Sequence, residues 1–132
     1  MKLQALKFSV ILLFFGITST THGQISTDDL QQLVGTWKLD MTPNDTSDNN
    51  YASMLITEIT PSTVKGEFYR TSVSIREGRV NTQSGLIYVA LVSSDNSGDY
   101  NTSFYYKDGT LFGSTHSLDR DFLAVWTATK IK

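Results

Sequence analysis

The sequence contains no cysteine, and only one of its two histidines lies beyond residue 23. Disulfide bonds are therefore excluded, so a folded domain has to be held together by side-chain packing and strand pairing alone. The shortage of Cys and His also removes most ligand sets for zinc, copper and iron. We therefore expect no metal site and no cofactor in this protein.

Basic residues are also scarce, and no long apolar run occurs after residue 23. The 132 residues carry 11 Lys and Arg against 13 Asp and Glu, a formal net charge of −2. No cluster of positive charge is available to neutralise a phosphate backbone, which argues against nucleic acid as a partner. Nothing beyond residue 23 approaches the roughly 20 apolar residues that a membrane-spanning helix needs, so we expect no membrane span.

The first 23 residues have the organisation of a secretory signal peptide. Lys2 and Lys7 form a positive n-region, and an apolar run follows at residues 8–17. That run is too short to span a bilayer, and small residues lead up to Gly23, after which we expect cleavage. The expected mature chain, residues 24–132, suits a single domain that is secreted or periplasmic. An uncleaved N-terminal anchor is the alternative.

Residues 26–34 favour one short helix or 3₁₀ turn. Ser26 or Thr27 can cap the free backbone N–H groups of the first turn, and the two aspartates that follow suit its positive end. Leucines and a valine continue at helical spacing until Gly35 ends the pattern. We expect this helix to plug one end of the fold.

From Trp37 onward the apolar pattern has a period of two, which is typical of half-buried strands. It predicts seven or eight strands, over residues 37–42, 51–60, 64–71, 74–82, 86–92, 100–107, 111–116 and 122–131, with a turn near Glu77 and Gly78 in the fourth. Asp108 and Gly109 separate two alternating runs and predict a two-residue type I′ hairpin. Short connections favour an all-β, up-and-down antiparallel barrel of about eight strands over a sandwich.

Two of these strands, 86–92 and 122–131, are apolar on both faces. Only one face of a barrel strand can point inward, so the outer face needs a cover. A second subunit is the simplest cover, which makes a homo-oligomer through strands 86–92 and 122–131 one expectation. A loop or the N-terminal helix lying over these strands is the other.

Several short segments together resemble the calycin superfamily of ligand-binding barrels, which includes lipocalins and avidins. The Gly-Thr-Trp segment at residues 35–37, after a short helix, looks like the lipocalin opening motif. In that family a basic side chain from the last strand packs over the tryptophan, which implies a contact of Lys130 with Trp37 that closes the barrel. Residues 65–68 resemble the third avidin strand, and Trp-Thr-Ala-Thr-Lys at residues 126–130 is similar to an avidin C-terminal segment.

The sequence departs from the avidins at the positions that bind biotin. The avidin Asn two residues after the first tryptophan is replaced by Leu39, and simple alignment places Ser72 where avidins use a Tyr. A third avidin position lies beyond Lys132. The resemblance therefore implies the fold but does not support biotin binding, because fold does not carry function across.

Aromatic side chains of the middle strands are the candidates for a ligand cavity. We expect Tyr88, Phe104, Tyr106 and Trp126 to line it, with hydroxyl groups that orient the ligand. The alternative is that these side chains simply fill the barrel, as they do in barrels of about eight strands. Arg79 and Asn81 alternate along one strand and form either an inward polar stripe or a solvated surface.

Catalysis has little support in the sequence. His116 could be combined with Ser114 or Ser117 and with Asp119, but nothing resembles a nucleophile elbow or an oxyanion hole. Asp119 and Asp121 around Arg120 are typical of a solvated loop. We therefore expect a non-enzymatic protein that binds a small apolar or amphipathic molecule. The alternative is a protein-interaction module or an oligomeric structural protein with a filled barrel.

Overall fold

The computed structural model describes residues 23–131 and begins with one short, capped helix, α1 (Thr27–Gln31). Ser26 is the N-cap: its hydroxyl accepts the backbone N–H of Asp29 at 3.1 Å, and the Asp29 carboxylate accepts the backbone N–H of Ser26 at 2.7 Å. The backbone N–H and the hydroxyl of Ser26 both donate to the Asp29 carboxylate and hold its pKa below the usual range. The predicted helix is confirmed, whereas the predicted signal peptide lies almost wholly outside the described residues.

Strands with alternating burial make up the rest of the described chain. Inward residues of β1 such as Trp37 and Leu39 are fully buried, and outward Lys38 is exposed, as the period of two requires. The strands are β1 (Gly35–Asp40), β2 (Tyr51–Ile59), β3 (Val64–Tyr69), β4 (Ile75–Asn81), β5 (Ile87–Asp95), β6 (Gly98–Lys107), β7 (Thr110–Ser117) and β8 (Phe122–Lys130).

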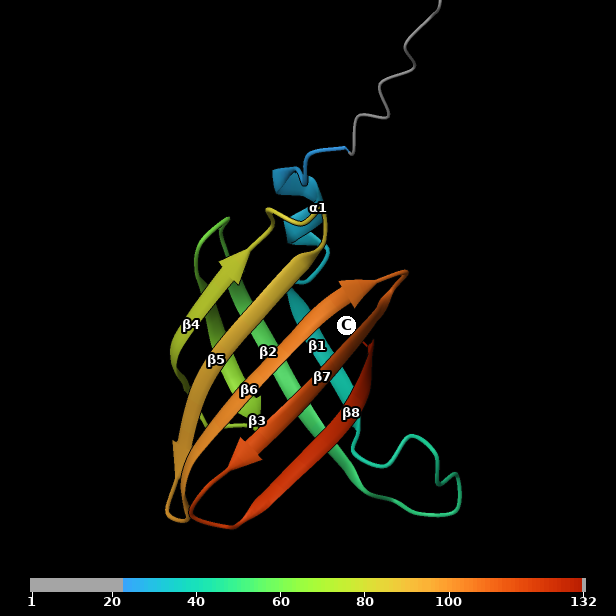
Figure 1. Cartoon of the computed structure of the whole chain (residues 1–132), viewed down its shortest axis with the longest axis vertical. Coiled ribbons are helices and arrows are strands. Elements are labelled where there is room, and N and C mark those ends of the chain that lie inside the picture. Colours follow the sequence, from blue (N-terminus) through green and yellow to red (C-terminus); the bar gives the residue numbers. More distant parts are fainter. Residues whose placement is uncertain (1–22, 132) are drawn as a thin grey trace, which may run out of the picture.

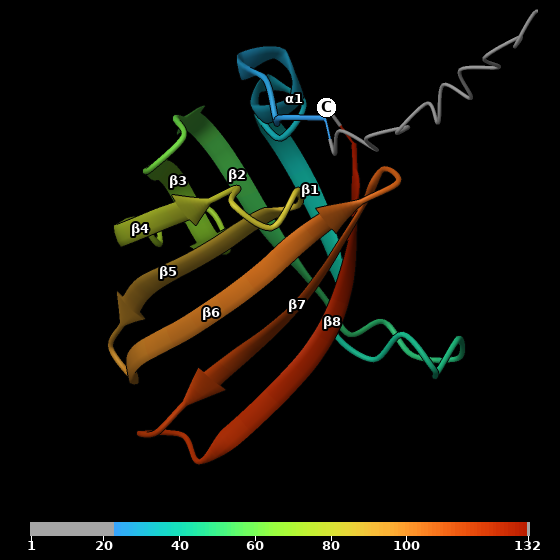
Figure 2. The ribbon, with the colours of Figure 1, turned by 45° about the horizontal axis from the view of Figure 1, so that its top comes forward.

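The strands form one antiparallel sheet of eight strands that curls into a nearly closed barrel (Figure 1). Sequential neighbours pair in order, and β1 also pairs with β8, where Trp37 lies opposite Lys130. Between β3 and β4 the ladder is reduced to two isolated bridges, Thr63 to Arg79 and Glu67 to Ser74. The expected up-and-down barrel is therefore confirmed, with an incomplete seam between β3 and β4 (Figure 2).

Local turn chemistry explains several of the connections. Asp108 and Gly109 both have positive φ, 51° and 82°, and join Lys107 of β6 to Thr110 of β7, as a type I′ hairpin requires. The predicted turn near Gly78 is wrong, because β4 runs through this position. Gly78 instead lies against β3, where an added Cβ would be 2.4 Å from the Val64 side chain.

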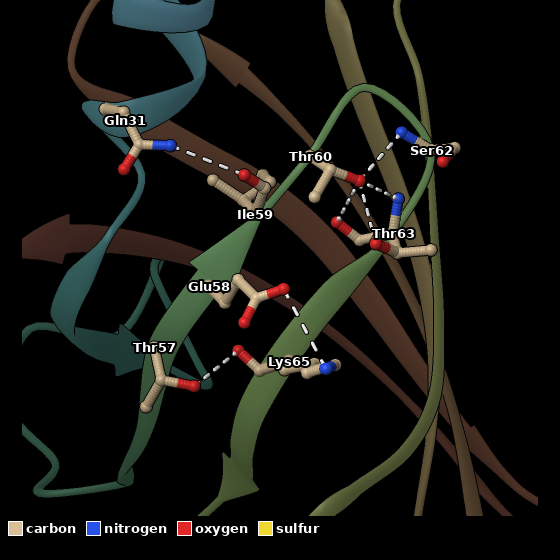
Figure 3. Close-up of polar contacts among 8 residues, drawn as sticks. All are labelled: Gln31, Thr57, Glu58, Ile59, Thr60, Ser62, Thr63 and Lys65. Carbon is tan, nitrogen blue, oxygen red and sulfur yellow. Dashed lines mark hydrogen bonds and ion pairs between the residues drawn. The ribbon is translucent and has the colours of Figure 1, made fainter.

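The helix closes one end of the barrel, and Figure 3 shows how its last turn meets the β2–β3 turn. Gln31 donates to the carbonyl of Ile59 at 3.4 Å, while the Thr60 hydroxyl accepts the backbone N–H groups of Ser62 and Thr63. Leu30 and Leu33, next to this contact, are buried. The helix therefore acts as the expected plug.

The two residues expected to close the barrel lie at this same end. The Trp37 indole N–H donates to the carbonyl of Leu33 at 2.9 Å, and the Lys130 ammonium donates to the carbonyl of Gln32 at 3.0 Å. Lys130 thus ties the last strand to the end of the helix. Within residues 23–131, no helix is long and apolar enough to cross a membrane.

Candidate functional site

A cavity of about 300 Å³ opens at the barrel end opposite α1. The loop at residues 41–50 and the β5–β6 and β7–β8 turns surround this open end (Figure 1). The lining residues lie at or next to the ends of β1, β3 and β7 and the starts of β2, β6 and β8, because an up-and-down barrel brings alternate strand ends together. The cavity is lined by Met41, Asn50, Tyr51, Ala52, Phe68, Tyr69, Tyr100, Thr115, Arg120, Phe122 and Ala124.

A hydrogen-bonded cluster of four side chains lies at the cavity. The hydroxyl groups of Tyr69 and Tyr100 both donate to the Asp95 carboxylate, at 2.8 and 3.1 Å. The Arg120 guanidinium donates to the Tyr100 hydroxyl at 3.2 Å, and the two tyrosine rings pack with centroids 5.1 Å apart. Asp95 therefore holds two cavity-lining rings in place, and Arg120 lies at the edge of the cavity with further N–H groups available.

The cluster shifts the pKa values of three of its members: that of Asp95 is lowered, and those of Tyr69 and Arg120 are raised. Partial burial works to raise the pKa of Asp95, but hydrogen bonds from the Ser97 N–H, Tyr69 and Tyr100 outweigh it and the pKa lies below its usual range. Burial, followed by the hydrogen bond to Asp95, raises the pKa of Tyr69. The hydrogen bond to Tyr100 raises the pKa of Arg120. At neutral pH the carboxylate and the guanidinium are both charged and Tyr69 is neutral.

Aromatic rings pack behind Phe68, which lines the inner wall of the cavity. Phe68 is fully buried and packs on Trp126, with ring centroids 6.1 Å apart, and Phe104 packs on the same indole at 5.9 Å. The Trp126 N–H donates to the Thr115 hydroxyl at 3.0 Å, which satisfies a polar group in the core. Gly113 leaves room for this indole, since an added Cβ would be 2.5 Å from Trp126.

Arginine side chains stack on aromatic rings at the mouth of the cavity. The Arg120 guanidinium carbon lies 5.2 Å from the centre of the Phe122 ring, and that of Arg70 lies 5.6 Å from the Tyr69 ring. Such cation–π contacts orient an exposed guanidinium without neutralising it. The mouth therefore presents two guanidinium groups, together with the Asp95 carboxylate, next to an apolar wall.

The six residues expected to bind ligand do not lie together. Phe104 and Trp126 are buried behind the cavity wall, and Tyr106 lies at the helix end, where it packs edge-on against Trp37 and donates to Gln32. None of these three lines the cavity.

The other three expected residues lie on the outside of the barrel. Tyr88 is 45% exposed, because β5 points Ile87 and Val89 inward instead. Arg79 and Asn81 are exposed on β4, and Arg79 pairs with Glu77 at 2.8 Å. The polar stripe expected on this strand is therefore the solvated surface.

Three residues of the hydrogen-bonded cluster at the cavity, Tyr69, Tyr100 and Arg120, are not among the residues that the sequence predicted to bind ligand. Tyr100 alternates in step with Phe104 and Tyr106, so the pattern already placed it inward. Tyr69 is the last residue of β3, where alternation no longer fixes the side of the sheet. Arg120 is exposed in the β7–β8 turn, as expected, but its reach to Tyr100 has no sequence signal.

The residues considered for catalysis are spread over both faces of the sheet. Ser114 and His116 belong to the outward-facing positions of β7, whereas Ser117 is buried and accepts the backbone N–H of Arg120 at 3.2 Å. Asp119 accepts the backbone N–H of Asp99 at 3.3 Å. Residues 23–131 contain no group of three or more His, Cys, Asp or Glu side chains that could hold a metal ion.

No protein-family model and no curated protein sequence matches the chain. Among solved structures, the chain is similar to the crystal structure of a mutant of the fluorescent protein UnaG. The two are 17% identical, the match covers 77% of this chain and 98% of that one, and the TM-score is 0.40. The chain forms an eight-stranded up-and-down antiparallel barrel with a short helix before the first strand, which is the architecture that the resemblance of residues 35–37 and 126–130 implied.

Proposed function

We propose that the protein is an exported, non-catalytic binding protein that holds one small amphipathic molecule in the cavity at the open end of its barrel. The observation that carries this proposal is the cavity of about 300 Å³, which has an apolar wall on one side and Arg120 at its edge. Its volume is at the lower end of the roughly 300–1,000 Å³ of ligand pockets. The proposed ligand is therefore small.

The arrangement of the lining residues defines an orientation for this ligand. Its apolar part would lie against Phe68, Phe122 and Ala124, and its polar part would face Arg120. Arg120 uses one hydrogen bond on Tyr100 and has other donors for a ligand acceptor. Because both tyrosine hydroxyl groups already donate to Asp95, the guanidinium is the principal ligand donor. A ligand with a carboxylate or another anionic group fits best.

Packing at the helix end favours one small molecule over a long chain. The inner half of the barrel is occupied by buried side chains, including Trp37, Leu39 and Trp126. A filled barrel was the alternative hypothesis, and it describes this half well. The open half supports binding, and the leader-like residues 1–23 support export.

A fluorescent amphipathic anion, anilinonaphthalene sulfonate, provides the first test. We expect residues 24–132 to bind it with saturable emission enhancement, and Ala124→Phe, which adds a ring inside the cavity, to abolish that enhancement. Ala90→Phe is the matched control, because Ala90 is exposed on the outer side of β5 and should leave this emission unchanged.

A second cavity variant keeps the test informative if Ala124→Phe does not fold. Ala52→Leu fills the cavity from β2 and should also reduce probe binding, with folding of each variant checked by circular dichroism. If the folded Ala124→Phe and Ala52→Leu proteins both bind the probe as the wild type does, the cavity is not the binding site and the proposal is wrong.

A further inference from the structure

The strands β5, β6, β7 and β8 lie side by side on one side of the barrel (Figure 1), and their outward-facing side chains are here called the outer face. Large exposed hydrophobic side chains gather on it: Tyr88 is 45% exposed, Phe112 37%, Leu123 65% and Val125 63%. Cross-strand pairing arranges its residues in three parallel rows. The outer face consists of Tyr88, Ala90, Val92, Asn101, Ser103, Tyr105, Phe112, Ser114, His116, Leu123 and Val125.

The first row is a ridge of three aromatic rings. Tyr88 pairs with Tyr105, and Tyr105 pairs with Phe112, so the rings come from three adjacent strands. Tyr105 and Phe112 stack with centroids 5.3 Å apart and an interplanar angle of 19°, and Tyr88 lies 5.6 Å from Tyr105. Tyr105 and Phe112 face one another across the strands, and the Tyr88 ring is tilted by 43° against Tyr105. The row therefore stands above the sheet as a ridge and offers no flat platform for a sugar ring.

The second row is a groove with a floor of small residues. Ala90, Ser103 and Ser114 pair across the same three strands. Two open hollows of about 440 and 430 Å³ lie over this part of the sheet, and both are lined by Ser103 and Ser114. The floor and the ridge are two residues apart along each strand, so the groove runs parallel to the ridge.

The outer face has the composition of the centre of an interface. None of its residues is Lys, Arg, Asp or Glu, and depletion of charge with enrichment of aromatic residues distinguishes interface centres from other surfaces. The nearest charges on β4, Arg79 and Glu77, neutralise each other as an ion pair at the edge. Two copies brought together here meet no like-charge repulsion within the face.

We propose that the outer face is the interface of a homodimer in which the ridge of each copy lies in the groove of the other. A twofold axis in the plane of the interface, parallel to both rows and midway between them, produces this arrangement. The axis keeps each strand opposite its own counterpart. Tyr105 of one copy therefore lies over Ser103 of the second copy, and the reverse contact is identical.

The area of the outer face is small for a stable interface. Four strands about 4.8 Å apart and five residues about 3.4 Å apart cover about 320 Å² in projection. That is within the range of functional patches, about 300–600 Å², and below the roughly 800 Å² per partner of a standard stable interface. The proposed dimer is therefore weak and forms as the protein concentration rises.

Sedimentation equilibrium over a series of loading concentrations tests this proposal. We expect residues 24–132 to show a reversible monomer–dimer equilibrium and Ser103→Arg, which puts a charge on the groove floor, to remain monomeric. Ser62→Arg is the matched control. Ser62 is exposed in the β2–β3 turn at the helix end (Figure 3), away from the outer face. The Ser62→Arg protein should therefore dimerise as the wild type does.

A mixing experiment tests the register of the two copies. Ser103→Glu and Tyr105→Lys chains should each be monomeric alone, since each places like or unpaired charges in the interface. Mixed together they should form a heterodimer, because Glu at position 103 faces Lys at position 105 at one contact while the other contact keeps the native Tyr105 and Ser103. A heterodimer that does not form, although both chains are folded, overturns the proposed register.

If Ser103→Arg fails to fold, Val125→Lys replaces it, because Val125 is 63% exposed at the β8 end of the groove. Monomer at every loading concentration of the wild type overturns the proposal. A dimer that persists in a folded outer-face variant overturns it as well. Either result is independent of ligand binding in the cavity.

Discussion

The Tyr69 hydroxyl donates a 2.8 Å hydrogen bond to the Asp95 carboxylate, 26 residues away in the sequence. Tyr69 ends β3 and Asp95 ends β5, so the bond crosses the incomplete seam at which β3 and β4 make only two bridges. The same carboxylate accepts from Tyr100. This one acid therefore connects the edge strand β3 to β5 and β6 at the mouth of the cavity.

Loss of this bond should loosen the seam. We expect Tyr69→Phe to lower the thermal midpoint and to increase amide hydrogen exchange in β3 and β4 more than in β6 and β7. The physical reason is that main-chain pairing across the seam is too sparse to replace the lost side-chain bond. Tyr88→Phe, on the outer face, is the control. Equal exchange changes in all strands would contradict a local role for this bond.

The pKa shifts of the same pair predict how stability depends on pH. Asp95 has a folded-state pKa below its ordinary 3.8, so its contribution is complete above about pH 4 and is lost as the pH falls through the folded-state pKa. Asp29 and Asp99 shift in the same direction. We therefore expect acid destabilisation, and Asp95→Asn should reduce its slope. Chemical denaturation of both proteins between pH 2 and pH 7 measures the difference, which should shrink below about pH 4.

Tyr69 contributes to the dependence of stability on pH in the alkaline range. Its folded-state pKa is above the ordinary 10.0, so its contribution is present below about pH 10 and is lost as the pH rises through the folded-state pKa. Ultraviolet titration of phenolate should show a late-titrating signal that is smaller in Tyr69→Phe. An unchanged titration curve would show that this side chain does not contribute to that signal.

The charge at the mouth should select for anionic ligands. We expect Arg120→Gln to weaken the binding of anilinonaphthalene sulfonate by about two- to five-fold, the effect of an exposed ion pair. An uncharged naphthalene probe should bind the wild type and the variant equally. Arg79→Gln, which removes a guanidinium from the outer surface, should change neither affinity. A parallel loss of both probes in Arg120→Gln would indicate a role in structure instead of charge recognition.

Removal of each of two buried hydroxyl groups should have a different effect on the free energy of unfolding. The Thr115 hydroxyl accepts from Trp126 and bonds Thr102 at 3.0 Å, so Thr115→Val should cost about 1–3 kcal/mol by leaving buried polar groups unpaired. The Ser93 hydroxyl is fully buried and has no hydrogen-bond partner within the described part of the chain. Ser93→Ala should therefore be neutral or stabilising. Urea denaturation compares the two, and the opposite ranking would contradict this assignment of the polar core.

The sequence was sufficient to predict the barrel because its local signals agree. The period of two placed Trp37, Leu39 and Phe104 inward, and the Asp108–Gly109 turn set one hairpin. Strand five was ambiguous because it is apolar on both sides, so periodicity could not decide whether Tyr88 or Val89 faces the interior. The structure assigns Val89 to the core and Tyr88 to the outer face.

The site could not be predicted to the same extent, because it forms where strands end. Tyr69 and Arg120 occupy the end of a strand and a turn, where alternation no longer specifies direction. Their contacts depend on barrel closure, which brings residues far apart in the sequence to one rim. The mid-strand aromatic residues that were expected to bind ligand instead build the wall behind the cavity or face outward.

Native mass spectrometry of residues 24–132, purified from an exporting host alongside Ala124→Phe, shows whether the cavity retains a small molecule. We expect the native wild-type protein to have a mass above that calculated from its sequence and to lose the excess on denaturation. The Ala124→Phe protein should show only the mass calculated from its own sequence. An identical retained mass in both folded proteins would place the ligand elsewhere. Wild-type protein that shows only its sequence mass, and that takes up no amphipathic anion when one is added, would contradict binding in this cavity.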